Sequence, residues 1–458
     1  MDKKLENFLF FTFFMTLMAP LSMEVSPGFR IYLFDFPLFG LYVCLFMRAC
    51  MHRVQLSLGA FDFFFLLFYA WNFYCSLNGE NFTNSIPWLW LWLHGYLIIF
   101  YMRHTVGSFI SERLLFTALG LSLIIEPGLA IIQTVTQSSV GAVQQYFGVL
   151  KARESGWLYE GSRVTRAQGT FMHTNFFGNW LVMLMPFLQA RITGSDQKFR
   201  GKYTLWWFGC LASLILTLSR ANWMAFLLGS LAVLFAERRY RKLWSSKRRW
   251  AAYLITPFLI IGMSYALFPE EVGFFTELVY ARAERTFDDK SSTIRSDLLI
   301  GAWTVLGENY VTGVGFGNSK IMIIESNPFI PSWFRATVHN IYLIVATETG
   351  ILGCVLFLML NLWPLFKIMK ALRYYSNGLP RETLDNAIGF IGCFVGLGFA
   401  MLWYVGMFNE SEFPLIMLLL GSALGISASM KRRAQAVQKE NRLARAAASN
   451  LIPQAVQA

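Results

Sequence analysis

Residues 114–136 read LLFTALGLSLIIEPGLAIIQTVT, an apolar run interrupted by a single ionisable side chain, that of Glu126. As a helix rising 1.5 Å per residue, about 20 such residues cross the roughly 30 Å hydrocarbon core of a bilayer. Comparable apolar runs recur along most of the chain. Because continuous apolar runs suit helices and not the alternating strands of a membrane barrel, the sequence predicts an all-α integral membrane protein.

The overall composition agrees with a bilayer as the solvent. Of the 458 residues 55% are hydrophobic and 14% are charged, and the mean hydropathy is +0.46. The first apolar run begins at Leu5, is too long for a signal peptide and lacks a small-residue cleavage site, so we expect a retained helix. The six cysteines lie in or beside apolar segments without a CxxC spacing, which argues against disulfides or a zinc site.

We expect about twelve transmembrane helices in a single domain over residues 1–430. The expected spans are 5–23, 29–47, 60–77, 86–102, 114–136, 169–190, 204–219, 222–236, 251–268, 337–365, 388–408 and 414–430. The segments 137–168 and 269–336 are too long to be turns and mix aromatic with charged side chains. Both are predicted to fold over one membrane face.

The basic residues predict the orientation of the chain. Its net charge is +12, and the densest basic segments are ERRYRKLWSSKRRW at 237–250 and the tail 431–458, which begins KRR. By the positive-inside rule we expect a bacterial inner-membrane protein with both termini and this tail in the cytoplasm and the two long loops in the periplasm. The basic clusters then reflect topology and contact with anionic membrane lipids, and no nucleic-acid partner is expected.

Arg220 is the arginine that most suggests a function. Arginine forks match phosphate oxygens, although ion pairs with nearby acids would explain most arginines on the predicted periplasmic side. Arg220 differs because it lies in the tight turn SRAN (219–222) between two apolar segments, where a charge is costly and usually functional. The alternative is that its side chain snorkels to the lipid headgroups.

His339 and a polar cluster mark two points where the long loops return to the membrane. His339 begins the run HNIYLIVATETGILG, and a neutral imidazole near arginines is suited to take a proton from a sugar hydroxyl. A structural role at a helix start is the alternative. The cluster GTFMHTN (169–175) can bind sugar hydroxyls, or it can cap and pack the helix that follows.

The glycines of GVGFGN (313–318) do not make a nucleotide site, because the Lys-Ser/Thr pair and the strand and helix context are missing. They can let the backbone approach a diphosphate or make a tight turn, and we favour the turn.

The acids of the loop 269–336 have no histidine partners at ligand spacing. We therefore expect no catalytic metal.

Taken in order, three elements of the sequence resemble the bacterial O-antigen ligase and repeat-unit polymerase superfamily. They are RAQGTFMHTNFFG (166–178), TLSRANWMAFLLG (217–229), and IRSDLLIGAWTVLGENYVTGVGFGN (294–318) followed by VHNIYLIVATETGILG (338–353). The resemblance implies a GT-C-like membrane glycosyltransferase that takes glycan from undecaprenyl diphosphate at the periplasmic face and needs no metal or other cofactor. Arg220, Arg295 and His339 match essential positions of that family.

By that likeness Arg220 and Arg295 hold the donor diphosphate, while His339 positions or deprotonates the acceptor hydroxyl and the linkage is inverted. Further substrate-binding candidates are Arg166, Thr170, His173, Asn175, Gly315, Gly317 and Asn340. The acceptor is either a second lipid-linked repeat unit, as in a polymerase, or lipid A-core, as in a ligase. We favour the polymerase because of the GTFMHTN element and the first long loop.

A polysaccharide transporter or flippase is the distant alternative. A transporter places ionisable residues near the bilayer midplane. Glu126 and Glu348 are the acids within apolar runs that could mark such a cavity.

Overall fold

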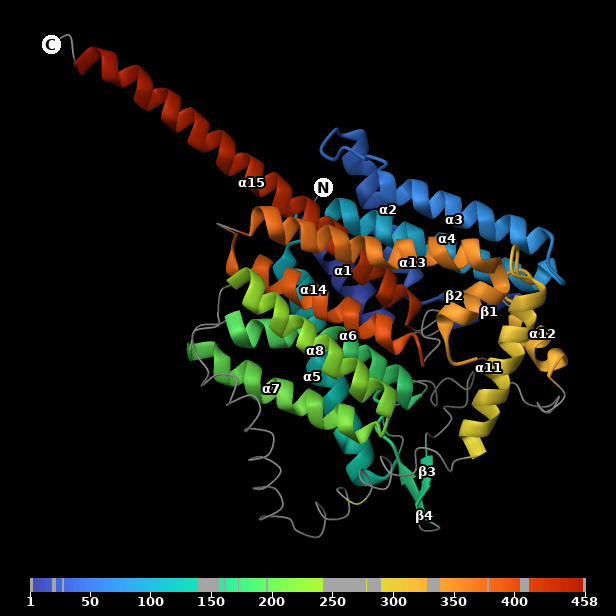
Figure 1. The fold of residues 1–458 in the computed structure, drawn as a ribbon. Helices are drawn as coiled ribbons and strands as arrows, with labels where there is room; N and C mark the ends of the chain where they lie inside the picture. The colour runs from blue at the N-terminus through green and yellow to red at the C-terminus, as the bar shows by residue number, and fades with distance from the viewer. Residues whose placement is uncertain are drawn as a thin grey trace.

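The computed structural model describes residues 3–18, 22–26, 29–138, 140, 156–159, 162–171, 173–194, 197–241, 277, 290–327, 338–376, 379–403 and 412–455. In this part the chain is helical apart from two short antiparallel strand pairs (Figure 1). The first elements are α1 (Lys3–Met18), β1 (Ser22–Ser26), β2 (Phe29–Tyr32), α2 (Asp35–Cys50), α3 (Ala60–Leu77), α4 (Phe82–Thr105) and α5 (Glu112–Thr136). The others are β3 (Gly156–Tyr159), β4 (Ser162–Thr165), α6 (Thr174–Gly194), α7 (Gln197–Leu216), α8 (Arg220–Arg241), α11 (Lys290–Glu308), α12 (Ser319–Ser326), α13 (Ile341–Tyr375), α14 (Arg381–Ala400) and α15 (Phe413–Ala455).

Six helices of the described part are long and apolar enough to cross a membrane: α3, α4, α5, α13, α14 and α15 from Phe413 to Glu440. They coincide with six of the expected spans, so the chain is a multi-pass membrane protein. Helices α1, α2, α6, α7 and α8 lie at five more of the expected positions. The expected span 251–268 lies outside the described residues, and the total of twelve crossings stays a prediction.

The start of the second expected span differs from the structure. Residues 29–32 form strand β2, which pairs antiparallel with β1, and α2 begins only at Asp35. The backbone N–H of Tyr32 donates to Asp35 Oδ2 at 2.8 Å just before the helix. Pro27 and Gly28, which interrupt the apolar pattern of the sequence here, disfavour a helix and favour a turn.

Helix α14 is packed closely against α6 and α8, and glycines permit this approach (Figure 1). A Cβ atom at Gly392 would lie 2.8 Å from both the Gly229 carbonyl oxygen of α8 and Pro186 Cβ of α6. The helices are antiparallel, because Asp385 near the start of α14 forms an ion pair with Arg241 at the end of α8. The end of α14 therefore lies at the level where α6 and α8 begin.

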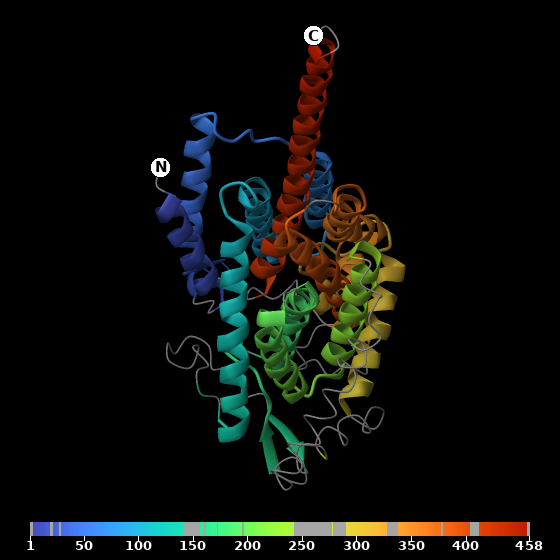
Figure 2. The same ribbon diagram turned by 90° about the vertical axis from the view of Figure 1, so that its left-hand side faces the viewer.

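Helix α15 runs from the centre of the bundle out into solvent. Its first half packs against α4, where a Cβ atom at Gly421 would lie 2.8 Å from the backbone of Ile99. Its second half stands away from the other helices (Figures 1 and 2). The predicted boundary between residues 430 and 431 falls inside this continuous helix, and the division into a domain and a cytoplasmic tail stays a prediction.

Candidate active site

Two of the elements singled out in the sequence, 166–178 and 217–229, are held together by hydrogen bonds. Arg166 Nε and Thr174 Oγ1 both donate to the carbonyl oxygen of Thr217, at 2.8 and 2.9 Å. The backbone N–H of Ala167 donates to the carbonyl oxygen of Leu216 at 3.2 Å. The segment before α6 is therefore fastened to the turn that leads into α8.

Arg220 is the first residue of α8 and follows a strained turn. Leu218 has a φ of 51°, which is a sparsely populated conformation for a branched side chain and is typical of functional sites. A cation at a helix N-terminus opposes the helix dipole, so Arg220 is not placed there for the stability of the helix. The N-terminus of α8 and the guanidinium instead attract an anion together. This geometry suits one end of a diphosphate.

The starts of α6 and α8 also touch through Asn175 and Asn222. Asn222 Nδ2 donates to the carbonyl oxygen of Asn175 at 3.0 Å. A Cβ atom at Gly178 would overlap the Asn222 amide, so a glycine is required at that crossing. His173 Nδ1 accepts from the backbone N–H of Asn175 at 3.1 Å, which places the imidazole proton on Nε2. His173 and Asn175 are thus tied to the first turn of α8, which begins at Arg220.

Glu126 and Gln133 of α5 hold the turn at 168–170. Glu126 is buried, and its two carboxylate oxygens accept from Thr170, from the backbone N–H at 2.9 Å and from Oγ1 at 2.8 Å. Gln133 accepts from the backbone N–H groups of Gln168 and Gly169 and donates to the Gly169 carbonyl oxygen. The Thr170 hydroxyl is used as a donor here and offers a ligand only its acceptor lone pairs.

Gly315 and Gly317 lie in a tight turn packed between other elements. Their φ angles are 88° and 80°, in the region that favours glycine. The backbone N–H of Gly315 donates to the carbonyl oxygen of Glu348 at 3.0 Å, and a Cβ atom at Gly315 would lie 2.9 Å from Gly79 Cα. The structure thus places both glycines in the turn that we favoured. Their contact with substrate stays a prediction.

This turn docks into a kink of α13 at Gly350, where φ is 69°. A Cβ atom at Gly350 would overlap the carbonyl oxygen of Val311, so only a glycine fits. Ser319 Oγ donates to Glu348 Oε1 at 2.7 Å, and this bond ties the start of α12 to α13. Glu348 is therefore engaged in holding the turn.

His339 lies just before α13, beside Arg295 of α11. Burial, followed by the positive charge of the exposed Arg295, lowers the pKa of His339 to about 4. The imidazole is therefore neutral near pH 7 and can accept a proton. Asn340 caps α13, because its Oδ1 accepts from the backbone N–H of Leu343 at 3.1 Å. Of the three residues that the resemblance implies, Arg295 thus lies near enough to His339 to influence its charge.

The packing of α14 shows that Arg220 lies at the same end of the bundle as His339. The backbone N–H of Ile341 donates to the carbonyl oxygen of Met401 at 3.0 Å, just after the last residue of α14. The end of α14 lies at the level of the start of α8, as the antiparallel packing requires. Arg220 and His339 are therefore at one end and one level of the bundle.

Comparison with protein families bears on this arrangement. Residues 205–358 match the family model described as O-antigen ligase. The resemblance to the O-antigen ligase and polymerase superfamily is confirmed. The O-antigen ligase match contains Arg220, Arg295 and His339, and it supports a membrane protein with a glycosyltransferase-like function. No curated protein matches the chain.

Two positions of this candidate site escaped the sequence analysis. Gln133 forms three hydrogen bonds with the 168–169 turn, and the backbone carbonyl of Thr217 anchors Arg166. Gln133 lies seven residues after Glu126, on the same helix face, so two polar residues at this spacing in an apolar run were the available signal. The backbone carbonyl of a residue leaves no signal in a sequence.

Among the described residues, no group of three His, Cys, Asp or Glu side chains could hold a metal ion.

Proposed function

We propose that the protein transfers glycan from undecaprenyl diphosphate to a sugar hydroxyl at the end of the bundle that carries His339. The observation that carries this proposal is the neutral, half-buried imidazole of His339 near the positive charge of Arg295. It combines a proton acceptor and a phosphate-binding cation at one point, at the same level as Arg220. These are the groups that displacement of a diphosphate by a hydroxyl requires.

In the proposed step the acceptor hydroxyl attacks the anomeric carbon of the donor and gives its proton to the His339 imidazole. The bond between that carbon and the diphosphate oxygen breaks, and the diphosphate leaves with the electron pair. Arg220 and Arg295 offset the charge that develops on the leaving oxygen. Attack from the side opposite the diphosphate inverts the anomeric configuration. No metal is needed, because two guanidinium groups supply the charge that a metal ion supplies elsewhere.

Binding of the donor would also tune the base. In the free protein the positive charge of Arg295 helps to keep the pKa of His339 near 4. A bound diphosphate brings negative charge beside Arg295, which favours the protonated imidazole and raises the pKa of His339. A base is most effective when its pKa is near the working pH. His339 thus becomes a competent base when the donor is present.

The acceptor most consistent with the sequence is a second lipid-linked repeat unit, which makes the protein a repeat-unit polymerase. Lipid A-core is the alternative acceptor, and transfer to it would make the protein an O-antigen ligase. In either case we place the site at the periplasmic face of the inner membrane, with residues 1–430 as the membrane domain and residues 431–458 as a cytoplasmic tail. The basic segments 237–250 and 431–433 support this orientation.

Transport of polysaccharide is less well supported. Of the acids considered for a transport cavity, Glu126 accepts two hydrogen bonds from Thr170, and Glu348 Oε1 accepts one from Ser319 Oγ. Such carboxylates hold loops in place and are not poised to bind a moving substrate.

The test is an assay of the purified protein with undecaprenyl-diphosphate glycan, alone and with lipid A-core. His339→Ala is compared with wild type, and His52→Asn, an exposed histidine with a φ of 53°, is the matched control because asparagine tolerates that conformation. A lengthening glycan ladder without lipid A-core, lost only in His339→Ala, supports the polymerase. Transfer only with lipid A-core supports the ligase. The absence of reaction in both arms would contradict the proposal and favour transport.

A further inference from the structure

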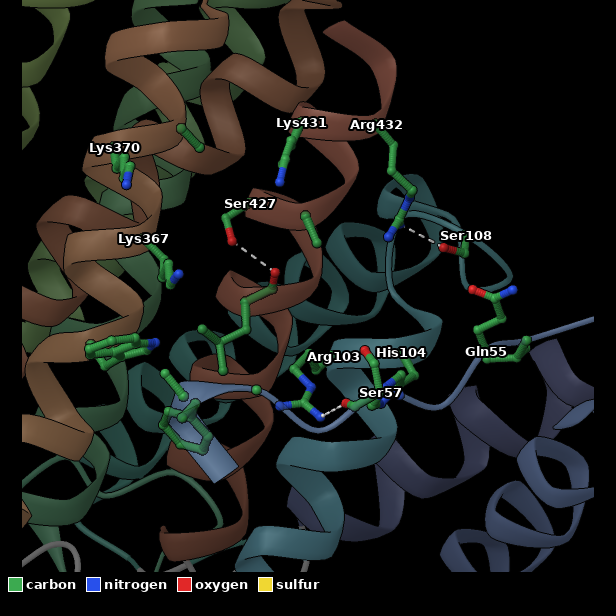
Figure 3. A pocket seen from close by; sticks show the side chains of 18 of the residues that line it. Gln55, Ser57, Arg103, His104, Ser108, Lys367, Lys370, Ser427, Lys431 and Arg432 are labelled. Atoms are coloured by element: carbon green, nitrogen blue, oxygen red, sulfur yellow. Dashed lines mark hydrogen bonds between the residues drawn. The ribbon is translucent and has the colours of Figure 1, made fainter. Parts of the chain in front are cut away.

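A large basic cavity lies at the opposite end of the bundle from His339. Its volume is about 830 Å³, and it opens between the second half of α13, the first half of α15, the end of α4 and the segment before α3 (Figure 3). Lys367 is 26 residues beyond Ile341, roughly 39 Å along the path of α13. Among the described residues the lining includes no acid and these six cations: Arg53, Arg103, Lys367, Lys370, Lys431 and Arg432.

One of the six cations is neutralised and another is held by an uncharged group. Arg103 Nη1 contacts both oxygens of Asp62, at 2.8 and 2.7 Å, and its Nη2 donates to the Ser57 carbonyl oxygen at 2.9 Å. Arg432 Nη2 donates to Ser108 Oγ at 2.8 Å, which orients the guanidinium without offsetting its charge. The side of the cavity formed by α4 and α15 is therefore an ordered arrangement of donors (Figure 3).

The other side of the cavity concentrates uncompensated charge. Lys367, Lys370 and Lys431 form no ion pair with any residue that the structure describes. The ammonium groups of Lys370 and Lys431 lie near enough to that of Lys367 to repel it electrostatically. Two helices hold these like charges together, α13 and α15 (Figure 3). An anion in the cavity would relieve this repulsion.

Apolar side chains accompany the charges and point to a lipid. Phe61 and Trp363 line the cavity, and the Lys367 ammonium lies 5.1 Å from the centre of the Trp363 ring. Phe61 belongs to α3 and Trp363 to α13. These two helices also expose large apolar side chains beyond the cavity, among them Phe63 and Phe366. A free phosphate would use the cations alone, whereas a lipid would use both surfaces. We propose that the cavity binds the phosphate headgroup of an anionic membrane lipid, with its acyl chains along α3 and α13.

This proposal is independent of the transfer reaction and can be tested by binding. The full chain, purified in detergent, is titrated with phosphatidylglycerol, with phosphatidylcholine and with inorganic phosphate, and bound lipid is counted by native mass spectrometry. The test variant carries Lys367→Gln and Lys431→Gln. Each basic residue near a lipid surface contributes about fivefold to binding, so we expect this variant to bind phosphatidylglycerol about thirtyfold more weakly.

Two variants control for charge and for folding. Arg238→Gln with Arg239→Gln removes the same charge from an exposed part of α8 outside the cavity, and binding should stay close to wild type. Lys367→Arg with Lys431→Arg keeps the charge and should keep the binding. Equal affinity for phosphatidylcholine, unchanged binding in the Gln variant, or full competition by inorganic phosphate would each overturn the lipid assignment.

Discussion

Arg166 Nε donates to the carbonyl oxygen of Thr217 at 2.8 Å, although 51 positions separate the two residues in the sequence. The bond joins the segment that precedes α6 to the strained turn that precedes Arg220. Because the accepting atom belongs to the backbone, the bond sets the path of the turn and not merely one side chain. We therefore expect Arg166 to position Arg220, in addition to any contact it makes with substrate.

The first prediction concerns Arg166. Lysine keeps the charge of arginine but lacks the planar fork, so Arg166→Lys should lose this bond to Thr217. A small misplacement of Arg220 should lower kcat by at least about tenfold while the lipid donor still binds. Steady-state transfer assays that separate kcat from KM test this. A rise in KM with unchanged kcat would show instead that Arg166 only binds substrate.

The second prediction concerns the buried carboxylate that holds the turn at 169–170. Glu126→Gln replaces one acceptor of the two Thr170 hydrogen bonds with an NH₂ donor, so one backbone or hydroxyl donor is left without its partner. A lost buried hydrogen bond costs about 1–3 kcal/mol. Thermal unfolding in detergent should show a clear decrease in Tm.

Thr170→Val provides the partner for a double-mutant cycle with Glu126→Gln. The two substitutions should be less than additive, because they remove one shared interaction. Fully additive effects would contradict a direct role of the Thr170 hydroxyl in holding Glu126.

The third prediction concerns the pH dependence of transfer. Protonation removes the ability of His339 to act as a base, so activity should fall as the pH decreases through its pKa. For kcat/KM, which reports the free protein, the acid limb should lie near pH 4 and not near the ordinary histidine value of about 6.5. For kcat, which reports the complex, the bound diphosphate should move this limb to higher pH.

Arg295 provides the control for that profile. Arg295→Gln removes the charge that contributes to the low pKa of His339, so the acid limb of kcat/KM should move upward. Arg295→Lys keeps the charge and should leave the limb near its wild-type position. An unchanged limb in Arg295→Gln would show that the two side chains are not electrostatically coupled.

The fourth prediction concerns the kink in α13. Gly350→Ala should destabilise the protein strongly, because the new Cβ atom would overlap Val311 and the φ of 69° is unfavourable for alanine. Gly128→Ala is the matched control in a membrane helix, since nothing lies within 4 Å of a Cβ atom there. Its stability should be equal to or slightly above that of wild type. Yield and Tm of the two purified variants decide the matter.

The helices could be predicted from the sequence, because an apolar run such as 114–136 satisfies its backbone hydrogen bonds in a bilayer by forming a helix. The pairing of β1 with β2 could not, since the residues of β2 lie inside what reads as the second apolar segment. His339 and Arg295 could be identified as residues, and their proximity is an outcome of packing. The bonds from Glu126 and Gln133 to the 168–170 turn escaped prediction because they join residues about 35 to 45 positions apart.

The kink at Gly350 interrupts α13 at a buried position, where the backbone groups freed by the kink need protein partners. The carbonyl oxygens of Thr347 and Glu348 accept from the 314–315 turn, and that of Thr349 accepts from Trp71 Nε1 at 2.8 Å. All of these donors precede α13 in the chain, so the ribosome has made them before α13 emerges. The segments that bond to the kink are thus already synthesised when α13 inserts into the bilayer. The order of these elements along the chain therefore suits the order in which they must assemble.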